Sequence, residues 1–520
     1  MTEPRSPKIV PFASARAHFD AVRAQGRRIV LSHGIFDLIH PGHIAHLEGA
    51  RALADVLVVS VPSDPHVHKG PGRPYFTEQL RLRSLAALEC VDFAVLVPHA
   101  GALEAIEAIR PEVFCRGKEY EDPEYDDSGS LQEEKQTVER IGGVVRFAGA
   151  IKFSSTKLLN LYFEHPTGPI REFCLGLAQT QTRKSFSEAV ESLASLRVLV
   201  VGEAIFDRYS TVRVQGLTSK NRILSGRFLN QETQCGGALA AFRHVRQFTP
   251  HARFLSVVGT EPWVDPFLGQ HLRSEEDLVI RDTRSTTIVK ERFVEPRRED
   301  AELSKLFSVN YLDPDPPAPE VQQTFEQRFR QAASECDAVL LLDFGHGLLQ
   351  PRLRELIQDT APFLVLNCQT NSNNHGFNIL PRQYRHANVF TLDEQEILLA
   401  VGHRQPDFQA ELARLKSQLG AQYAWLTRGP IQTLGLFGTP NDTAPTATLC
   451  PTFEPEVVDT VGAGDAFFSV AGLAAARKLP LDLATFMGQL AGAQAVRIVG
   501  NARPISKPIL IKSGMSLLER

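Results

Sequence analysis

The chain has 520 residues, of which 43% are hydrophobic and 22% charged, and its formal net charge is −4. A chain of this length predicts about two to four domains with ample core. A net charge this small provides no basic field for nucleic acid or a membrane surface, so we expect neither as a partner. The seven cysteines include no Cys-x-x-Cys pair, which indicates a reducing, cytoplasmic compartment and argues against structural zinc or a disulfide framework. The N-terminus lacks the apolar core of a signal peptide, and no run is long enough to cross a bilayer.

Apolar strand-like runs alternate with helical stretches through the first part of the chain. A helix is expected over 14–25, with Ser14 as its N-cap and Gly26 at its end. The expected strands that follow are 28–32, 56–61, 93–97, 112–115 and 144–147. The expected helices between them are 43–54, 77–89, 101–109 and 130–141. This alternation predicts a parallel sheet with helices on both faces, whose ligands bind at the carboxyl ends of the strands.

The run SHGIFDLIHPGH, which ends at His43, follows the first of these strands and leads into a helix. His40 and His43 therefore lie at a strand-to-helix turn, where partial positive charge attracts phosphate. Gly42 allows the backbone to approach closely, and two imidazoles can donate to phosphate oxygens. The alternative is a structural role, in which one histidine caps the helix and the other is exposed to solvent. That interpretation fits a single histidine better than it fits this motif. We predict that both histidines stabilise charge on an α-phosphate under attack.

A Gly/Pro-rich loop, 67–74, follows the second strand and contains Lys69. This lysine either closes over the phosphates or is an ordinary solvated loop residue. His66 and His68 have the spacing of a metal chelate, but no third ligand is apparent, so we interpret them as loop residues.

Two further segments are expected at the same edge of the sheet. Arg116 and Gly117 follow the fourth strand and place a cation at its end. Ser154, Ser155 and Thr156 open a later helix, where their hydroxyls serve either as an N-cap or as ligands for the outer phosphates.

Residues 26–160 resemble the nucleotidyltransferase superfamily that includes glycerol-phosphate and ethanolamine-phosphate cytidylyltransferases and heptose-phosphate adenylyltransferases. They look most similar to the adenylyltransferase half of the bifunctional heptose-phosphate enzymes of lipopolysaccharide precursor synthesis. The resemblance implies a Rossmann-like domain that transfers a nucleotidyl group from ATP or CTP to a sugar-1-phosphate and releases pyrophosphate. It implies His40, His43 and Lys69 as catalytic, and as nucleotide-binding Gly34, Ile35, Phe36, Asp37, Gly42, Arg81, Arg116, Gly117, Ser154, Ser155 and Thr156. His33 and Lys118 depart from the family pattern and leave the base and the substrate open.

The run HPTGP at 165–169 interrupts the alternation and predicts an interdomain turn. The residues that follow are helical in character. We therefore expect a nucleotidyltransferase domain over 1–165, a helical linker over 166–195 and a second domain over 196–520.

The second domain is expected to open with a buried strand, RVLVVGE at 197–203. Asp207 lies just beyond it and can accept hydrogen bonds from two sugar hydroxyls, although such a residue is more often a turn or cap. Gly236 and Gly237 open another helix and let backbone N–H groups approach a ligand.

The run DTVGAGD, which ends at Asp465, precedes an apolar helix near the C-terminus. The N–H groups of Gly462, Ala463 and Gly464 are expected to converge on one point, as an anion hole for a transferring phosphoryl group. Asp465 is held at that point as a candidate general base for the acceptor hydroxyl.

This run resembles the signature of the ribokinase-like (PfkB) carbohydrate kinases, and the start of the domain looks most like their heptose-7-phosphate branch. The resemblance implies a ribokinase-like α/β domain with a small β lid, expected over 212–232, which often pairs subunits, so we expect a homodimer. It implies Mg²⁺ and ATP as cofactors, with Glu396 near the metal. The nucleotide-binding residues it implies are Asp393, Glu396, Thr427, Gly429, Gly462, Ala463 and Gly464, and the substrate-binding residues Asp207, Gly236, Gly237 and Lys290.

The kinase half departs from the branch at Ala240, at Asp393 and at NCQT, 367–370, which replaces Asp-Pro-Lys-Gly. Because the phosphoryl-transfer residues are retained, we interpret these departures as a changed acceptor rather than a dead kinase.

We therefore predict a bifunctional enzyme of sugar-nucleotide synthesis that uses nucleoside triphosphates and sugar phosphates. It phosphorylates a heptose-like sugar or sugar phosphate at the anomeric hydroxyl, and it converts a sugar-1-phosphate to an ADP- or CDP-sugar. The transferase precedes the kinase, the reverse of the familiar order. Two alternatives remain: a transferase whose kinase-like half only binds or dimerises, and a cytidylyltransferase for a polyol or alcohol phosphate, which would prefer CTP to ATP.

Overall fold

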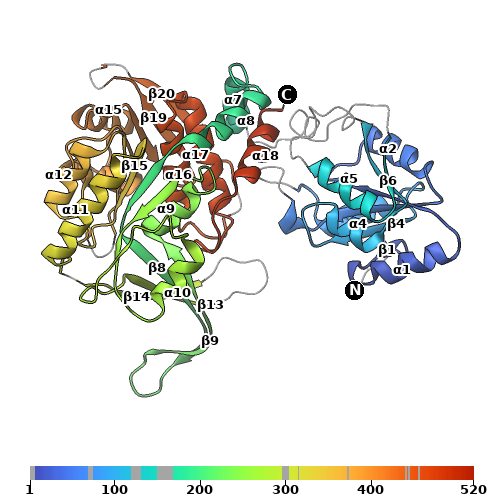
Figure 1. Cartoon of the computed structure of the whole chain (residues 1–520), viewed down its shortest axis with the longest axis horizontal. Helices are drawn as coiled ribbons and strands as arrows, with labels where there is room; N and C mark the ends of the chain where they lie inside the picture. The colour runs from blue at the N-terminus through green and yellow to red at the C-terminus, as the bar shows by residue number, and fades with distance from the viewer. Residues whose placement is uncertain are drawn as a thin grey trace. The chain divides into compact units, whose positions relative to one another are not determined.

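The computed structural model describes residues 6–67, 74–118, 130–148, 168–295, 304–313, 315–371, 374–439, 442, 445–454 and 457–519. The chain forms two compact units (Figure 1). Unit 1 comprises Met1–Gly168 with Glu519–Arg520, and unit 2 comprises Pro169–Leu518. Within the described ranges, every helix is too short or too polar to span a bilayer.

Unit 1 is built on a six-stranded sheet in the order β1-β4-β3-β2-β5-β6, in which every pair is parallel. Its elements are β1 (Ile9–Val10), α1 (Phe12–Ala24), β2 (Ile29–His33), α2 (Pro41–Arg51), β3 (Val56–Pro62), η1 (Asp64–His66), α3 (Glu78–Ala86), β4 (Phe93–Val97), α4 (Leu103–Ile109), β5 (Val113–Gly117), α5 (Ser130–Arg140) and β6 (Val144–Ala148). Because β3 and β5 lie on opposite sides of β2, the strand order reverses there, and such a reversal is where open α/β sheets bind ligands.

Apolar side chains from both faces of this sheet form two separate core clusters. Phe19 and Ile106 belong to one cluster and Leu47 and Leu82 to the other, so helices cover both faces. The predicted α/β class is therefore confirmed for unit 1.

Three details of unit 1 differ from the sequence expectation. Helix α1 begins at Phe12 rather than after Ser14, because the Ser14 hydroxyl donates to the Pro11 carbonyl (3.0 Å) from inside the first turn. Helix α2 begins at Pro41, with His40 as its N-cap. Strand β1 was not expected, because two residues are too few to show a periodicity.

Unit 2 is built on an eight-stranded sheet in the order β10-β7-β15-β16-β17-β18-β19-β20, parallel from β10 to β18 and antiparallel beyond. Its elements up to β14 are α7 (Gly168–Leu177), α8 (Arg183–Glu191), η4 (Ser192–Ser195), β7 (Val198–Gly202), β8 (Ala204–Leu217), β9 (Leu224–Gly236), α9 (Gly237–Val245), β10 (Ala252–Leu255), β11 (Val257–Val258), α10 (Val264–His271), β12 (Ile280–Arg281), β13 (Val289–Glu295) and β14 (Ser304–Tyr311). The remaining elements are α11 (Pro319–Ala333), β15 (Ala338–Asp343), α12 (Pro351–Thr360), β16 (Leu364–Cys368), α13 (Leu380–Gln383), β17 (Val389–Asp393), α14 (Glu394–Val401), α15 (Phe408–Gln418), β18 (Tyr423–Thr427), β19 (Gln432–Phe437), β20 (Thr446–Pro451), α16 (Ala463–Ala476), α17 (Leu481–Ala495) and α18 (Lys507–Leu517).

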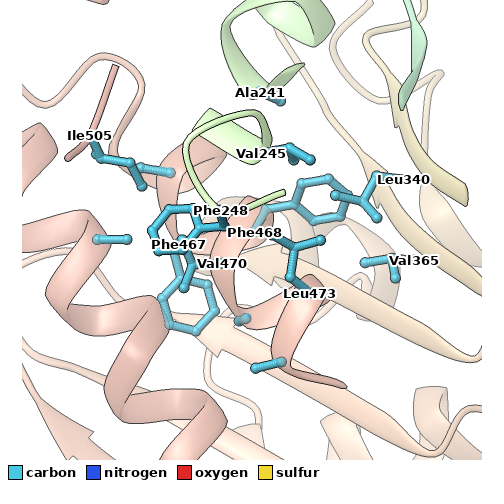
Figure 2. Packing of buried hydrophobic residues seen from close by; sticks show 14 of the residues in the cluster. Ala241, Val245, Phe248, Leu340, Val365, Phe467, Phe468, Val470, Leu473 and Ile505 are labelled. Carbon is cyan, nitrogen blue, oxygen red and sulfur yellow. The ribbon is translucent and has the colours of Figure 1, made fainter. Parts of the chain in front are cut away.

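Helices cover both faces of this sheet as well, with α9, α16 and α17 on one side and α11, α12 and α15 on the other (Figure 1). Helix α16 is apolar around most of its circumference and lies within the larger core (Figure 2). Figure 2 shows Phe468 and Leu473 of α16 beside Val365 of the sheet. This packing fixes the N-terminus of α16 at the carboxyl ends of the strands.

Residues 168–195, expected as a linker, form α7, α8 and η4. Ile170, Cys174, Phe186 and Val190 are buried in the core of unit 2. The apolar residues of these helices therefore pack against unit 2.

A separate four-stranded sheet in the order β14-β13-β8-β9 contains the expected lid segment. Strand β8 pairs antiparallel with β9 and parallel with β13, and the β8–β9 hairpin extends beyond the other strands (Figure 1). The predicted class, an α/β domain with a small β lid, is thus confirmed in unit 2.

Candidate active sites

His40 caps helix α2 with its own ring. Its Nδ1 accepts the backbone N–H groups of Gly42 (3.1 Å) and His43 (3.3 Å), and the residue is buried. The N–H of Gly42, a residue expected at the nucleotide, is thus bound by the ring of His40. Since Nδ1 acts as an acceptor, the proton of the neutral ring lies on Nε2. The helix cap therefore fixes the tautomer of the His40 imidazole.

The ring of His43 contacts both His40 and Phe36. The two histidine rings stack with centroids 3.9 Å apart, and the edge of Phe36 meets His43 at 5.1 Å. Phe36 has a φ of 49°, which is uncommon for a residue with a side chain. Its ring lies so close to Gly34 that a Cβ there would meet it at 3.0 Å. The predicted residues Gly34, Phe36, His40 and His43 are thus brought together after β2.

Arg81 and Asp37 brace this turn from inside the protein. Arg81 is fully buried, and its guanidinium donates to the carbonyls of Ile35 (2.8 Å), Pro62 (2.8 Å) and Phe76 (3.1 Å) and to Asp64 (2.8 Å). Asp37 Oδ1 accepts the Phe76 N–H at 2.9 Å. Sequence reasoning predicted both Arg81 and Asp37 as nucleotide-binding, whereas these bonds hold the loop after β2 against the loop after β3.

We predict that Arg81→Met lowers the free energy of unfolding by about 3 kcal/mol, because each carbonyl left buried without a donor costs roughly 1–3 kcal/mol. Urea denaturation measures the loss. The control is Arg83→Met, on the exposed side of α3, which should change stability by about 0.5 kcal/mol or less. A loss for Arg81→Met no larger than for Arg83→Met would contradict the bracing role.

Arg116 and Gly117 end β5, the neighbour of β2, as expected from the sequence. Arg116 Nε donates to Glu134 Oε2 at 2.9 Å, and its Nη2 donates to Oε1. Glu134 on α5 is buried, so this bidentate pair neutralises much of the positive charge expected at the strand end.

The remaining predicted residues of unit 1, Lys69, Ser154, Ser155 and Thr156, lie outside the described residues, as does His68. His66 Nδ1 shares a hydrogen bond with Ser63 Oγ at 2.8 Å. No group of three or more metal-ligating side chains occurs in the portions of the chain that can be described.

Asp465 lies in the first turn of α16, at the carboxyl ends of the strands of unit 2. Its Oδ1 accepts a hydrogen bond from Gln369 Nε2 (2.9 Å), which follows β16. Burial raises the pKa of Asp465 to about 7, with Asp207 adding to the rise and Gln369 and Lys290 opposing it. A carboxylate with this pKa can accept a proton near neutral pH.

The start of α16 is where an anion hole is expected beside Asp465. The Ala463 N–H donates to Thr460 O and the Ala466 N–H to Gly462 O, which leaves the N–H groups of Gly464 and Asp465 as the donors of the first turn. Gly464 is exposed, and a Cβ there would meet nothing within 4 Å. Gly462 has a φ of 83°, and a Cβ there would lie 2.1 Å from Asn501 Oδ1. The two glycines therefore differ: one is required by the backbone and one faces open space.

We predict opposite results for alanine at these positions. Gly462→Ala should lower the free energy of unfolding by roughly 1–2 kcal/mol or more, because left-handed strain adds to the clash with Asn501. Gly464→Ala should leave stability within about 1 kcal/mol and lower ADP formation by up to about 10²-fold, because its methyl group displaces the phosphoryl group from the donors. Thermal unfolding and coupled ADP assays measure both, with pyrophosphate release in the same samples as the control. Equal kinase rates for Gly464→Ala and wild type would contradict the anion hole.

The side of the site expected to hold the acceptor combines Asp207, Lys290 and two glycines. Lys290 on β13 is the register partner of Asp207 on β8. A Cβ on Gly236 would lie 2.3 Å from Asp207 Oδ2, so only glycine fits there, and Gly237 follows at the start of α9. Burial lowers the pKa of Lys290, whose ammonium lies 5.7 Å from the centroid of Phe344.

The residues expected to bind the nucleotide lie at the ends of neighbouring strands. Asp393 ends β17, and its register partner Thr427 ends β18, with Gly429 two residues beyond at a φ of 49°. Asp393 and Glu396 form a reciprocal capping box at the start of α14. Glu396 is buried and also accepts the Thr370 N–H at 3.1 Å. Burial, reinforced by Asp393, raises the pKa of Glu396 to about 8.

Three residues of this site were not singled out from the sequence. Arg292 forms an ion pair with Asp207. It follows Lys290 by two residues and so lies on the same face of β13, and this spacing could have identified it from the sequence. Glu203 is buried and accepts the N–H groups of Phe344 (3.0 Å) and His346 (3.2 Å), and burial with nearby Asp343 raises its pKa. Gln369 was noted only as a departure from a family motif.

The fold and the two sites define an α/β protein with a candidate phosphate-transfer site in each unit. Residues 31–167 match the cytidylyltransferase-like family. The chain is 42% identical to "Bifunctional protein HldE" of Magnetococcus marinus over 121 residues, 23% of this chain and 25% of the relative. It is 36% identical to the protein of that name from Geotalea uraniireducens over 167 residues, 32% of each chain.

The chain thus spans about a quarter to a third of the length of these curated relatives. They confirm the resemblance to bifunctional proteins of this kind that was expected from the sequence.

Solved structures similar to this chain include a putative ribokinase from Agrobacterium tumefaciens, with TM-score 0.46 and 18% identity over 62% of this chain and 99% of that one. Another is the ribokinase of Arabidopsis thaliana complexed with ribose and ATP, with TM-score 0.47 and 14% identity over 62% and 99%.

Proposed function

We propose that this chain is a bifunctional enzyme of sugar-nucleotide synthesis. Unit 2 phosphorylates the anomeric hydroxyl of a sugar or sugar phosphate, and unit 1 converts a sugar-1-phosphate to a nucleoside-diphosphate sugar. The observation that carries the proposal is Asp465, held by Gln369 beside the open Gly464 at the start of α16. The histidine pair at the start of α2 supports a second, separate transfer.

In unit 1 the sugar-phosphate oxygen attacks the α-phosphorus of the triphosphate, and the bond to pyrophosphate breaks. His40 donates from Nε2 to the α-phosphate oxygens, since its Nδ1 is held by the helix start. His43, stacked on His40, is placed to assist the same oxygens. No protein nucleophile takes part, so positioning and electrostatics supply the rate.

In unit 2 the acceptor hydroxyl gives its proton to Asp465 as its oxygen attacks the γ-phosphorus. The bond to the bridging oxygen breaks, and ADP leaves. The N–H groups of Gly464 and Asp465 stabilise the charge on the transferring phosphoryl group. Asp207 and Lys290 hold the acceptor from the lid side.

The acceptor we propose is heptose-like and carries a phosphate of its own. Arg292 and Lys290 lie on the same face of β13 beside Asp207, which places two cations along one carboxylate. Two cations on one face of a strand can hold a phosphate group, which favours an acceptor that carries one. The resemblance of the sequence to bifunctional heptose-phosphate enzymes favours consecutive use of a phosphorylated sugar, and either ATP or CTP can serve the transferase.

ATP and Mg²⁺ are the cofactors we propose for the kinase. Magnesium in such kinases is usually bound by one or two carboxylates together with phosphate oxygens and water. Glu396, which accepts the Thr370 N–H, is the acidic group we propose to hold that water. Bound there, the ion would neutralise charge on the phosphates.

The test is a matrix of sugars and sugar phosphates against ATP and CTP, assayed separately for ADP and for pyrophosphate. We expect ADP with at least one sugar, and pyrophosphate with the corresponding 1-phosphate. A protein that forms neither product with any pair would overturn the proposal.

A second candidate follows from the cytidylyltransferase-like match of residues 31–167. In that case unit 1 activates a polyol or alcohol phosphate with CTP, and unit 2 only binds or dimerises. Pyrophosphate release with CTP and glycerol phosphate, without ADP formation from any sugar, would favour it over the first.

We also propose that the lid pairs two copies of the chain in the cytoplasm. Phe307, Val309 and Tyr311 alternate along the edge strand β14 and are 37–53% exposed, so they form one apolar face. All seven cysteines are free, which suits a reducing compartment. Such a face on an edge strand favours a second copy of the same strand.

We predict that Val309→Lys converts a dimer to monomers in sedimentation experiments, because it places a like charge in both copies of the paired face. The control is Val457→Lys, an exposed valine outside the lid. A wild-type chain that sediments as a monomer at micromolar concentration would contradict the pairing.

A further inference from the structure

The segment after β16 ties the proposed base of the kinase to the nucleotide side of the site. Gln369 donates from Nε2 to Asp465 Oδ1 (2.9 Å), and its neighbour Thr370 donates its N–H to Glu396 (3.1 Å). Gln369 is itself held at both backbone groups. Its N–H donates to Asp343 O (2.8 Å), and its carbonyl accepts from Asn378 Nδ2 (3.1 Å).

Asn378 makes this anchorage rigid. Its amide also donates to Asp343 O (3.1 Å), and its own carbonyl accepts the Thr370 hydroxyl (3.0 Å). Asp343 is fully buried and is bound by Arg354 (2.8 Å) and Tyr384 (2.6 Å). The side chain of Gln369 therefore extends from a backbone that is fixed to the central strand β15, and its amide has a defined position.

Among the described residues, Gln369 supplies the one side-chain hydrogen bond to the carboxylate of Asp465. Asp207 and Lys290 act on that carboxylate only through their charges. The last torsion of an aspartate is broad, so a carboxylate without a directional partner rotates readily. The amide of Gln369 removes this freedom at Oδ1 and leaves Oδ2 for the proton of the acceptor.

We propose that Gln369 is a positioning residue of the kinase reaction, acting through Asp465. This inference rests on the proposed function of unit 2. The amide is neutral, so it orients the carboxylate without placing a second full charge beside it. Because Gln369 acts on the base and not on the substrates, its loss should lower kcat and leave KM for ATP and for the sugar unchanged.

The experiment compares Gln369→Met, which keeps the length and removes the donor, with Gln369→Asn, which keeps the amide but withdraws it by one methylene. Both should lower kcat for ADP formation by about 10–100-fold, the range expected when a reacting group is misplaced by about 1 Å. KM for both substrates should stay within about twofold of wild type. Gln395→Met, an exposed glutamine on α14, is the matched control and should keep wild-type values.

A double-mutant cycle shows whether the effect passes through Asp465. In the Asp465→Asn background, Gln369→Met should cause no further loss of kcat. In a second cycle, read out by Tm, the losses caused by Gln369→Met and by Asp465→Ala should be less than additive in the double variant. A folded Gln369→Met with wild-type kcat overturns the inference, as does a raised KM with unchanged kcat, which would make Gln369 a substrate contact. A wild-type chain that forms no ADP with any sugar overturns the proposed kinase, and with it the role of Gln369. A wild type that forms ADP, with an unaffected Gln369→Met variant, overturns the role of Gln369 alone.

Discussion

Asp465→Asn is expected to lower kcat for ADP formation by about 10²–10⁴-fold, the usual contribution of a general base. Asparagine has nearly the same shape and can still accept the hydrogen bond from Gln369, so the geometry at the start of α16 is retained. It cannot take the proton of the acceptor hydroxyl. The loss should therefore fall on kcat, with KM for ATP and the release of pyrophosphate by unit 1 unchanged.

The pH dependence of the wild type provides a second readout of the same group. Burial raises the pKa of Asp465 to about 7, so the carboxyl is protonated and inactive below that pH and ionised above it. We expect kcat to rise about tenfold per pH unit on the acid side and to level off above about pH 7. This acid limb should be missing from the residual activity of Asp465→Asn.

The matched control for this pair of measurements is Asp482→Asn. Asp482 is also an acidic residue in the first turn of a helix, α17, but it caps the Leu483 N–H of its own helix. We expect Asp482→Asn to retain kcat and the acid limb. Unchanged kcat in Asp465→Asn, or equal losses in both variants, would contradict a general-base role for Asp465.

The fold was accessible from the sequence wherever an element has a strong local signal. The strand at Phe93–Val97 was predicted to the residue, because five consecutive apolar residues form an interior strand of a parallel sheet. The motifs at His40 and Asp465 were placed correctly at helix starts, because a glycine-rich turn between a strand and a helix allows few conformations. These signals lie within a few residues of the elements that they define.

What could not be predicted depends on partners far along the chain. The bracing role of Arg81 was not predicted, because its acceptors, Ile35 and Pro62, lie 46 and 19 residues away in other loops. The pairing of Gln369 with Asp465 spans 96 residues. A motif gives the type of a side chain, whereas the number of its donors that remain for a ligand is decided by tertiary contacts.

The ring of His40 caps helix α2 through Nδ1 and, in the proposed reaction, donates to the α-phosphate through Nε2. Substitutions can separate these two functions. His40→Asn should lower the rate of pyrophosphate release by about 10²–10³-fold, the cost of one preorganised donor. Asparagine is among the best N-cap residues, and its Oδ1 lies at the same number of bonds from the backbone as Nδ1 of histidine. It can therefore accept the N–H groups of Gly42 and His43 while offering nothing in place of Nε2–H.

His40→Ala removes both functions and should lose the same activity together with about 1 kcal/mol of unfolding free energy. His43→Ala, which removes the stacked partner and leaves the cap in place, should resemble His40→Asn. Initial rates of pyrophosphate release and urea denaturation, measured on all three variants, separate the two functions. If His40→Asn kept the wild-type rate while His40→Ala lost it, His40 would act only as a cap, and the α-phosphate donors of unit 1 would have to come from His43 and the backbone alone.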